Sequence, residues 1–436
     1  MKLFPRILTP LSNLIIAALY AFFYNYVYNE YILVVWGHFY TDRPTHAMSY
    51  IEFFIYFLLS CIPFLFYKGV TTIAAAFSLF VFMFVYIPFV DALLIYEFPD
   101  SIRYPYLLVF FLLMCLFFAT DRKYLFKNLL SNAKAKLPMG FLEYLTLLLF
   151  AFLVIINKSS LRFVNFFSDA EDLYLYREDM ANVSAIYLLC WIRSAFLPIL
   201  TIYYLNNQKF KRYFLCMCAY IILFMLDKQK LTIIFPIAIT TIYYISLKYK
   251  SHFSKYFHLV LILIFIIVPI VVVAYQADPI VSVLAMTIVM RLQCMAGLQM
   301  EHYFDFFVVN NNPFTLYGHI NVINLLTGIY PYKESIGKTI NTDGSDSNAT
   351  FLLMDGVAAG GIVGCLIIGV TFIILKSIIN SCDRKCDVSL CVSIFLFSIQ
   401  SLLNVSLFTT FFTHGILMIL IIFFFFNLKG LSYLKN

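Results

Sequence analysis

Long apolar runs separated by short polar connections are the feature that most constrains the fold of this chain. A helix needs roughly 20 mostly apolar residues to cross a bilayer. Runs of about this length recur along the whole sequence, at about residues 7–28, 49–67, 70–90, 104–120, 140–157, 180–204, 213–226, 231–247, 258–275, 356–376, 388–408 and 411–428. Only 12% of the 436 residues are charged, whereas soluble domains carry about 25%. The sequence therefore predicts an all-α polytopic integral membrane protein, a single membrane domain over 1–436 with about twelve transmembrane helices.

The charged residues predict how these helices are oriented. Lys and Arg cluster in connections that, counted by helix parity, fall on one side together with both termini. Because cytoplasmic loops carry an excess of Lys and Arg, that side is predicted to be cytoplasmic. Nearly every carboxylate falls in the connections on the other side, including Asp91, Glu97 and Asp100. The net charge of +7 follows from this orientation rule and does not predict nucleic-acid binding.

The ten cysteines predict neither disulfides nor a zinc site. Most lie inside apolar runs, where Cys behaves as a small hydrophobe, and the others are not clustered as zinc ligands would be. No metal and no cofactor is predicted.

The stretch 276–355 differs from the rest of the chain, because it is rich in Asn, Gly, Asp and His and is predicted to be too polar for lipid. It forms one large loop on the acidic, outer side. Loops of this length usually carry function. We therefore expect the chemistry of the protein to take place in this loop, with the other helices anchoring the loop in the membrane.

Arg193 lies half-way along the run 180–204, where a cation costs at least about 2.5–3.5 kcal/mol. A guanidinium in such a place can clamp a phosphate or pyrophosphate, because it binds these oxyanions in bidentate fashion. The alternative is a structural ion pair with Glu52 or Glu143. Lys228 and Lys230 lie in the next turn on the outer side. They are predicted either to contact an anionic substrate or to cap the ends of the two helices.

Residues 280–309 of the large loop can form a helix that begins after Pro279. On an α-helix Arg291 and His302 would share one face, and Glu301 and Asp305 would share a neighbouring one. A cation beside titratable groups suits binding of an anionic leaving group next to a proton acceptor. The alternative is an amphipathic helix that lies on the bilayer surface with its polar face solvated.

Two further segments of the loop hold candidate glycan-binding residues. Tyr317-Gly318-His319 predicts a tight turn with an exposed ring and a second candidate base, His319. Aromatic rings stack on sugar faces, but they also anchor loops at the membrane interface. Asp346 and Asn348 lie in a polar run whose spacing does not fit the EF-hand calcium loop.

The layout and two short motifs resemble a known family. Ser347-Asn348 is followed by Gly361-Ile362-Val363-Gly364, and Arg193 is followed by Leu197 in an Arg-x-x-x-Leu pattern. Many helices, a large outer loop late in the chain and these motifs resemble the bacterial O-antigen polymerases (Wzy) and the related O-antigen ligases. The spacer before the glycine step is twelve residues rather than nine, and Ser347 stands where the ligases have His.

This resemblance implies a GT-C-like, metal-independent glycosyltransferase in the bacterial inner membrane. It would join oligosaccharide repeat units carried on undecaprenyl pyrophosphate, on the periplasmic face, with a chain-length regulator as a protein partner beside the membrane lipid. Arginines would neutralise the pyrophosphate leaving group. The proton of the acceptor sugar hydroxyl would be taken up by a base, which is His302, His319 or a carboxylate such as Glu301 or Asp305.

Three alternatives stay open. An O-antigen ligase would transfer glycan to lipid A-core, and the missing His counts against it. A lipid-linked oligosaccharide flippase or transporter tends to show internal repeats and broken helices. A non-catalytic scaffold leaves Arg193 and Arg291 unexplained.

Overall fold

The computed structural model describes residues 4–40, 43–124, 137–163, 183–249, 252–275, 278–341, 350–428 and 431. The described residues form helices joined by turns and loops, with two isolated β-bridges and no strand. The all-helical prediction is therefore confirmed for the described part of the chain. Every apolar run predicted from the sequence overlaps a helix there.

Nine helices within the described ranges are long and apolar enough to cross a membrane. They are Ile73–Ile95, Asp100–Thr120, Met139–Ile156, Ala185–Asn206, Lys230–Lys248, Tyr256–Ala274, Ile280–Val309, Leu352–Asp383 and Leu407–Phe425. Tyr50–Leu65 and Val388–Ser401 are shorter apolar helices. The membrane character is thus supported by length and composition, and the count of twelve stays a prediction.

The chain divides into two compact units. Unit 1 comprises Met1–Lys123, Lys255–Lys376 and Leu402–Leu407, and unit 2 comprises Tyr124–Ser254, Ser377–Ser401 and Phe408–Asn436. Each unit is built from segments that lie far apart in the sequence, so local sequence patterns do not reveal the division.

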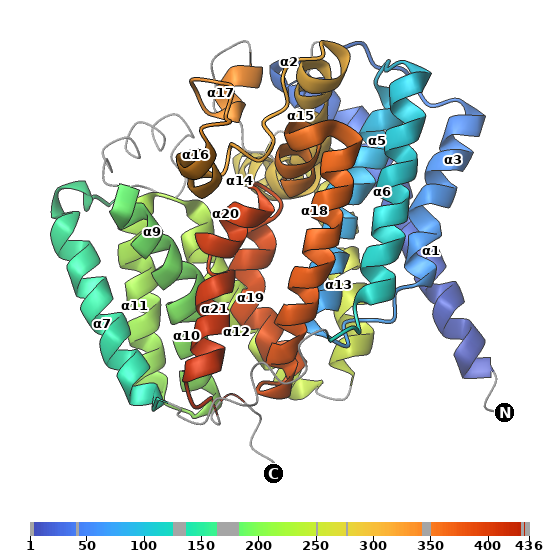
Figure 1. Ribbon diagram of the computed structural model, residues 1–436. Coiled ribbons are helices and arrows are strands. Elements are labelled where there is room, and N and C mark those ends of the chain that lie inside the picture. The colour runs from blue at the N-terminus through green and yellow to red at the C-terminus, as the bar shows by residue number, and fades with distance from the viewer. Residues whose placement is uncertain are drawn as a thin grey trace. The chain divides into compact units, whose positions relative to one another are not determined.

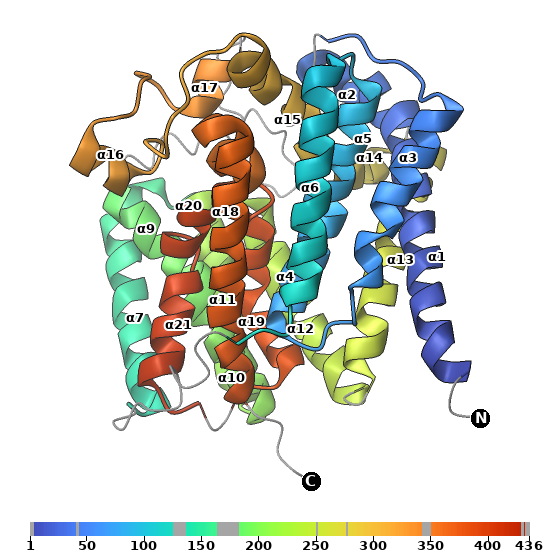
Figure 2. The same cartoon turned by 45° about the vertical axis from the view of Figure 1, so that its right-hand side comes forward.

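Unit 1 consists of an N-terminal group of helices and the later segment that includes the predicted loop. Its helices and helical turns are α1 (Phe4–Val27), η1 (Tyr28–Ile32), α2 (Leu33–Tyr40), α3 (Tyr50–Cys61), η2 (Pro63–Leu65), α4 (Ile73–Val81), η3 (Phe82–Tyr86), α5 (Ile87–Ile95), α6 (Asp100–Thr120), most of α13 (Phe253–Ala274), α14 (Pro279–Leu284), η6 (Ala285–Cys294), α15 (Met295–Phe304), η7 (Asp305–Val309), α16 (Asn321–Thr327), α17 (Ile336–Ile340), η8 (Leu352–Val357) and most of α18 (Ala358–Ile379). Figures 1 and 2 both show α2, α15 and α17 at the end of unit 1 opposite to the N-terminus. We call this the polar end of unit 1.

The centre of unit 1 is the continuous helix α4–η3–α5, which is buried along its whole length. Helix α5 packs against α1, α3, α6 and α15. A helix that is apolar on all sides is stable only where other helices surround it or lipid does. The polar residues at helix starts define where the helices begin: Ser49 and Glu52 form a capping box at α3, and Thr72 accepts a hydrogen bond from the Ala75 amide at α4.

Unit 2 is a second helical bundle. It contains α7 (Met139–Ile156), η4 (Lys158–Ser160), α9 (Val183–Trp191), η5 (Ile192–Phe196), α10 (Leu197–Asn206), α11 (Phe210–Asp227), α12 (Lys230–Lys248), η9 (Asn380–Arg384), α19 (Val388–Ser401), most of α20 (Leu407–Phe412) and α21 (Ile416–Phe425). Helix α19 packs against α10, α12 and η5 and is almost entirely buried.

The structure differs from the sequence analysis at two places on the predicted outer side. Ile280–Val309, predicted to be too polar for lipid, has the length and composition of a membrane-crossing helix. Its polar residues are few and scattered between apolar ones, so the composition of the whole stretch 276–355 concealed it. Asp91, predicted in an outer connection, lies inside α5 and is buried.

Candidate functional site

The first polar cluster lies at the polar end of unit 1 and is centred on two arginines. Arg43, in the loop after α2, donates a hydrogen bond of 2.7 Å to the carbonyl oxygen of Glu97 and forms an ion pair with Asp305. Its guanidinium lies 4.5 Å from the ring centroid of Phe98. Arg43 therefore ties the α2–α3 loop to the α5–α6 connection and to η7.

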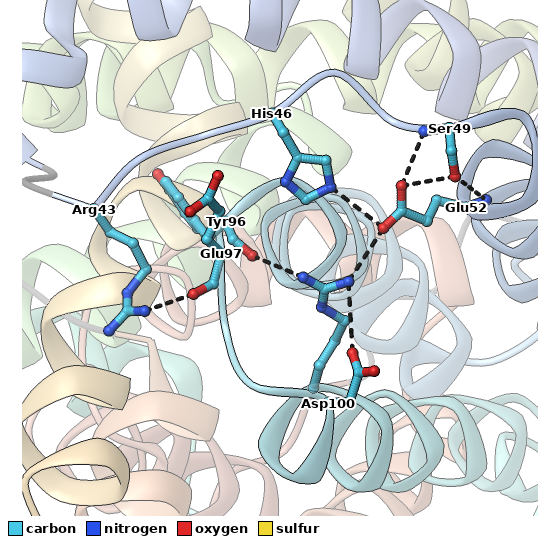
Figure 3. Close-up of polar contacts among 8 residues, drawn as sticks. Arg43, His46, Ser49, Glu52, Tyr96, Glu97 and Asp100 are labelled. Carbon is cyan, nitrogen blue, oxygen red and sulfur yellow. Dashed lines mark hydrogen bonds and ion pairs between the residues drawn. The ribbon is translucent and has the colours of Figure 1, made fainter.

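The second arginine of the cluster is Arg103 on α6, whose partners Glu52, Tyr96 and Asp100 are labelled in Figure 3. Its Nη1 lies 3.1 Å from Glu52 Oε1 and 3.9 Å from Asp100 Oδ1, and its Nη2 donates to the carbonyl oxygen of Tyr96. His46 Nε2 lies 3.3 Å from the same Glu52 oxygen. Both arginines of the cluster are thus neutralised by carboxylates, which suits a structural clamp at this end. Neither was predicted; the only local signal was the i,i+3 spacing of Asp100 and Arg103.

The second cluster contains the predicted base His319. Its Nε2 lies 2.6 Å from Asp355 Oδ1 and its Nδ1 lies 3.0 Å from Thr315 Oγ1. The other Asp355 oxygen accepts a hydrogen bond from the backbone amide of Leu407. The His319 and Asp355 side chains are 4% and 0% exposed. Because a carboxylate only accepts hydrogen bonds, the neutral His319 ring carries its proton on Nε2, and its Nδ1 accepts from the Thr315 hydroxyl.

A break at the start of α18 positions this cluster. Gly360 (φ −178°, ψ 31°) and Gly361 (φ +58°, ψ −133°) leave the helical conformation. The carbonyl oxygens of Ala358 and Ala359, just before this break, accept hydrogen bonds from the amides of Thr315 (2.8 Å) and Leu316 (3.1 Å). The Gly361–Gly364 motif of the predicted family is thus the point where the helix breaks and the loop attaches.

The loop itself is conformationally strained. Leu316 (φ 47°) and Tyr317 (φ 64°) adopt the left-handed conformation, which costs roughly 1–2 kcal/mol for each non-glycine residue. The Tyr317 hydroxyl donates to the carbonyl oxygen of Gly364 at 3.2 Å. Burial, together with the nearby charge of Asp355, raises the pKa of Tyr317. Strain of this kind persists where the surrounding structure enforces it, and it clusters at functional sites.

The other predicted residues of the large loop lie on the helix Ile280–Val309. Glu301 is buried, with a side chain 4% exposed, and its Oε2 lies 3.9 Å from His302 Nδ1. Asp305, four residues on, pairs with Arg43 instead. Arg291 is half-buried in the π-helical segment η6. Because a π-helix has wider turns than an α-helix, the spacing of eleven residues no longer implies a shared face for Arg291 and His302.

Arg193 is in unit 2, where its partner is neither of the predicted carboxylates. Its Nη1 donates to Asp227 Oδ2 at 2.7 Å and to Gln229 Oε1 at 2.6 Å. Glu52 pairs with Arg103, and Glu143 with Arg212. The expected alternative of a structural ion pair is therefore present, but the carboxylate is that of Asp227, the last residue of α11.

The two predicted lysines of unit 2 lie where α11 ends and α12 begins. Lys228 is fully buried, adopts a left-handed conformation (φ 51°) and donates from Nζ to the carbonyl oxygens of Ser160 (2.8 Å) and Leu226 (3.2 Å). A lysine that binds carbonyl groups at a helix end acts as a cap. Lys230 is the first residue of α12 and is half-buried.

The predicted site residues are thus divided between the units. His302, His319, Glu301, Asp305, Arg291 and Tyr317 belong to unit 1, and Arg193, Lys228 and Lys230 to unit 2. Asp346, Ser347 and Asn348 lie outside the described residues. All ten cysteines are free thiols, and the described residues hold no cluster of three or more His, Cys, Asp or Glu that could bind a metal.

Asp355 is the residue beside His319 that the sequence analysis did not predict. It stands just before the glycine step and follows an apolar run, so its local signal was a single carboxylate close to the start of a predicted membrane helix. Its partner His319 is 36 residues away. Comparison with protein-family models, with curated proteins and with solved structures finds no match to this chain. The functional argument therefore rests on the residues themselves.

Proposed function

We propose that this protein is an O-antigen polymerase, a GT-C-like, metal-independent glycosyltransferase that joins oligosaccharide repeat units carried on undecaprenyl pyrophosphate. The observation that supports the proposal best is the chain of hydrogen bonds from Thr315 through His319 to Asp355, which we call the His319 relay. It combines a base, a carboxylate that orients it, and a strained loop attached to a broken helix, within the segment that the family resemblance marks.

In the proposed reaction, Asp355 holds the His319 ring with Nδ1 as the free base. An acceptor sugar hydroxyl takes the place of the Thr315 hydroxyl at Nδ1 and transfers its proton there. The acceptor oxygen forms a bond to the anomeric carbon of the donor, and the bond from that carbon to the pyrophosphate oxygen breaks. The lipid pyrophosphate leaves with the electron pair, and the half-buried Arg291 of unit 1 is the cation proposed to neutralise it.

The proposed setting is the bacterial inner membrane. The basic connections and both termini would face the cytoplasm, and the polar end of unit 1 the periplasm. The family resemblance adds a chain-length regulator as the expected protein partner.

The proposal is tested by the lipopolysaccharide banding pattern of a host that lacks the gene and receives wild-type or variant protein. In the strain with His319→Gln, the lipopolysaccharide core should carry a single repeat unit. The reason is that loss of a general base lowers the rate of the catalysed reaction, here polymerisation, by about 10²–10⁴-fold. His46→Gln, which changes a histidine bound to Glu52 in the other cluster, is the matched control and should restore the ladder. Both variants must reach wild-type levels in the membrane.

A full ladder of bands from His319→Gln would show that His319 is not the base of the reaction. If the deletion strain has no repeat unit on the core at all, the function is that of a flippase or a ligase. The flippase is the second candidate, because substrate sites of transporters are built on discontinuous helices such as α18, and their charged residues lie inside the bundle.

A further inference from the structure

A short apolar helix in unit 1 follows the candidate base His319 and turns its side chains outward. None of the residues of α16 (Asn321–Thr327) is buried. Leu325 is 87% and Leu326 80% exposed, and Val322 and Ile329 are exposed as well. Large apolar side chains are unfavourable in water, and a patch of them on the outside of a protein marks a contact with another molecule or with lipid.

The excursion of the chain that carries α16 is closed at its base. The Gly318 amide donates a hydrogen bond of 2.7 Å to the Thr315 carbonyl oxygen. A Cβ at Gly318 would lie 2.8 Å from the Tyr330 amide nitrogen, so the two ends of the excursion are packed together. We call residues 319–329 the α16 hairpin. His319 is its first residue, so the position of the hairpin sets the position of this histidine.

Several polar groups of the α16 hairpin find their hydrogen-bond partners within the hairpin or directly beside it. Thr327 Oγ1 donates to the Ile323 carbonyl oxygen at 2.6 Å, and Asn324 Oδ1 accepts from the Tyr330 amide at 3.2 Å. The Gly328 amide donates to the Asn324 carbonyl oxygen at 2.7 Å. Lipid offers no hydrogen-bond partners, so polar groups at membrane depth must be paired inside the protein. These hydrogen bonds therefore suit a turn that lies in lipid.

The α16 hairpin lies level with the membrane-crossing helices of unit 1. In Figures 1 and 2, α17 lies at the tip of the polar end, and α16 lies farther from that tip, at a height that α6 also occupies. Helix α6 is long and apolar enough to cross the membrane. The exposed apolar side chains of the hairpin therefore lie beside the bilayer rather than above it.

The exposed apolar surface of α18 continues onto the loop that leads into the hairpin. Helix α18 belongs to the membrane-crossing helix Leu352–Asp383. It carries an exposed stripe at helical spacing, formed by Val363, Ile367, Val370 and Ile374. Leu316, whose amide donates to the carbonyl oxygen of Ala359 four residues before Val363, is 60% exposed. The lipid-facing surface thus extends from α18 toward α16.

We propose that the α16 hairpin is immersed in the bilayer and that its exposed apolar side chains contact lipid acyl chains close to the membrane surface. The hairpin then anchors the loop of His319 to the membrane at a depth that the helices alone do not fix. This contact goes beyond the proposed reaction, because it concerns where the loop lies and does not depend on which group is transferred.

The test uses the purified full-length protein in lipid nanodiscs that hold one copy each, with a bimane fluorophore attached to one introduced cysteine at a time. Leu325→Cys probes the hairpin. Lys338→Cys, at an exposed position of α17, is the control in water, and Val370→Cys, on the exposed stripe of α18, is the control in lipid. Phosphatidylcholine brominated on its acyl chains quenches from the lipid, and iodide quenches from water. The wild type gives the background from the native thiols.

Brominated lipid should quench the label of Leu325→Cys as strongly as that of Val370→Cys, and iodide should quench it several-fold less than that of Lys338→Cys. Iodide quenching equal to that of Lys338→Cys would place the hairpin in water and overturn the proposal. Protection from both quenchers would show that another part of the chain covers the hairpin, which also overturns it. Lipid quenching that disappears in discs with two copies would make a second copy the occupant, against the proposal. The lipopolysaccharide ladder tests the polymerase separately, so either proposal can fail without the other.

Discussion

Buried ion pairs hold charged side chains inside each unit. In unit 1, Lys376 Nζ lies 2.7 Å from Asp121 Oδ1 and donates to Ser78 Oγ at 2.6 Å. In unit 2, Arg193 is held by Asp227 in a comparable way. Removing one partner of such a pair costs about 3–5 kcal/mol, because the other charge is left buried and unpaired, whereas replacing both by apolar residues is nearly neutral.

This asymmetry separates a structural from a substrate-binding role for Arg193. Arg193→Met alone should destabilise the protein by about 3–5 kcal/mol, and Arg193→Met with Asp227→Leu should recover most of that loss. Unfolding in detergent, followed by tyrosine and tryptophan fluorescence, measures the stability, and the lipopolysaccharide ladder measures the activity. A double variant that is stable and active makes Arg193 structural; one that is stable but inactive supports the predicted pyrophosphate clamp.

The break in α18 is the element on which the candidate site depends. The loop that carries His319 is attached to the carbonyl groups of Ala358 and Ala359 just before it, and the positive φ of Gly361 makes the break possible. At this position a Cβ would also lie 3.0 Å from the Tyr106 hydroxyl and 3.3 Å from Phe314 Cζ. Gly360, by contrast, has open space around its Cβ position and an extended φ that any residue adopts.

The two neighbouring glycines therefore form a matched pair. Gly361→Ala should lower stability by roughly 1–3 kcal/mol, the cost of a backbone conformation nearly restricted to glycine, and should impair the ladder because the His319 loop loses its attachment. Gly360→Ala should stay close to wild type in both. Thermal unfolding of the two variants in detergent provides the comparison, and equal effects would show that the left-handed conformation is not required.

At the same scale, the helices were predictable and their breaks and partners were not. Hydropathy locates a membrane-crossing segment because its apolar length is a local property of the sequence. The partner of Arg193 and the carboxylate beside His319 depend on contacts between segments 34 and 36 residues apart, which no local pattern encodes. The π-helical turns of η6 were not predicted either, because the placement of Arg291 and His302 on one face assumed an α-helix.

At the scale of the whole molecule, the orientation in the membrane decides whether the proposed reaction is possible. Helix α6 has 21 residues and so measures about 30 Å, the thickness of a bilayer core. Its first residue, Asp100, is in the Figure 3 cluster at the polar end of unit 1, and exposed Lys123 follows its other end. If lipid-linked sugars react in the periplasm, Asp100 must lie outside and Lys123 inside.

Single-cysteine labelling in intact cells tests this orientation. Asp100→Cys should react with a membrane-impermeant maleimide added from outside, whereas Lys123→Cys should react only after the inner membrane is permeabilised. The wild type provides the background from the native thiols, of which seven are buried and three half-buried on apolar helices. Labelling of Lys123→Cys before permeabilisation, with Asp100→Cys protected, would place the polar end of unit 1 in the cytoplasm. The proposed polymerase would then be excluded, because its donor and acceptor meet on the opposite side of the membrane.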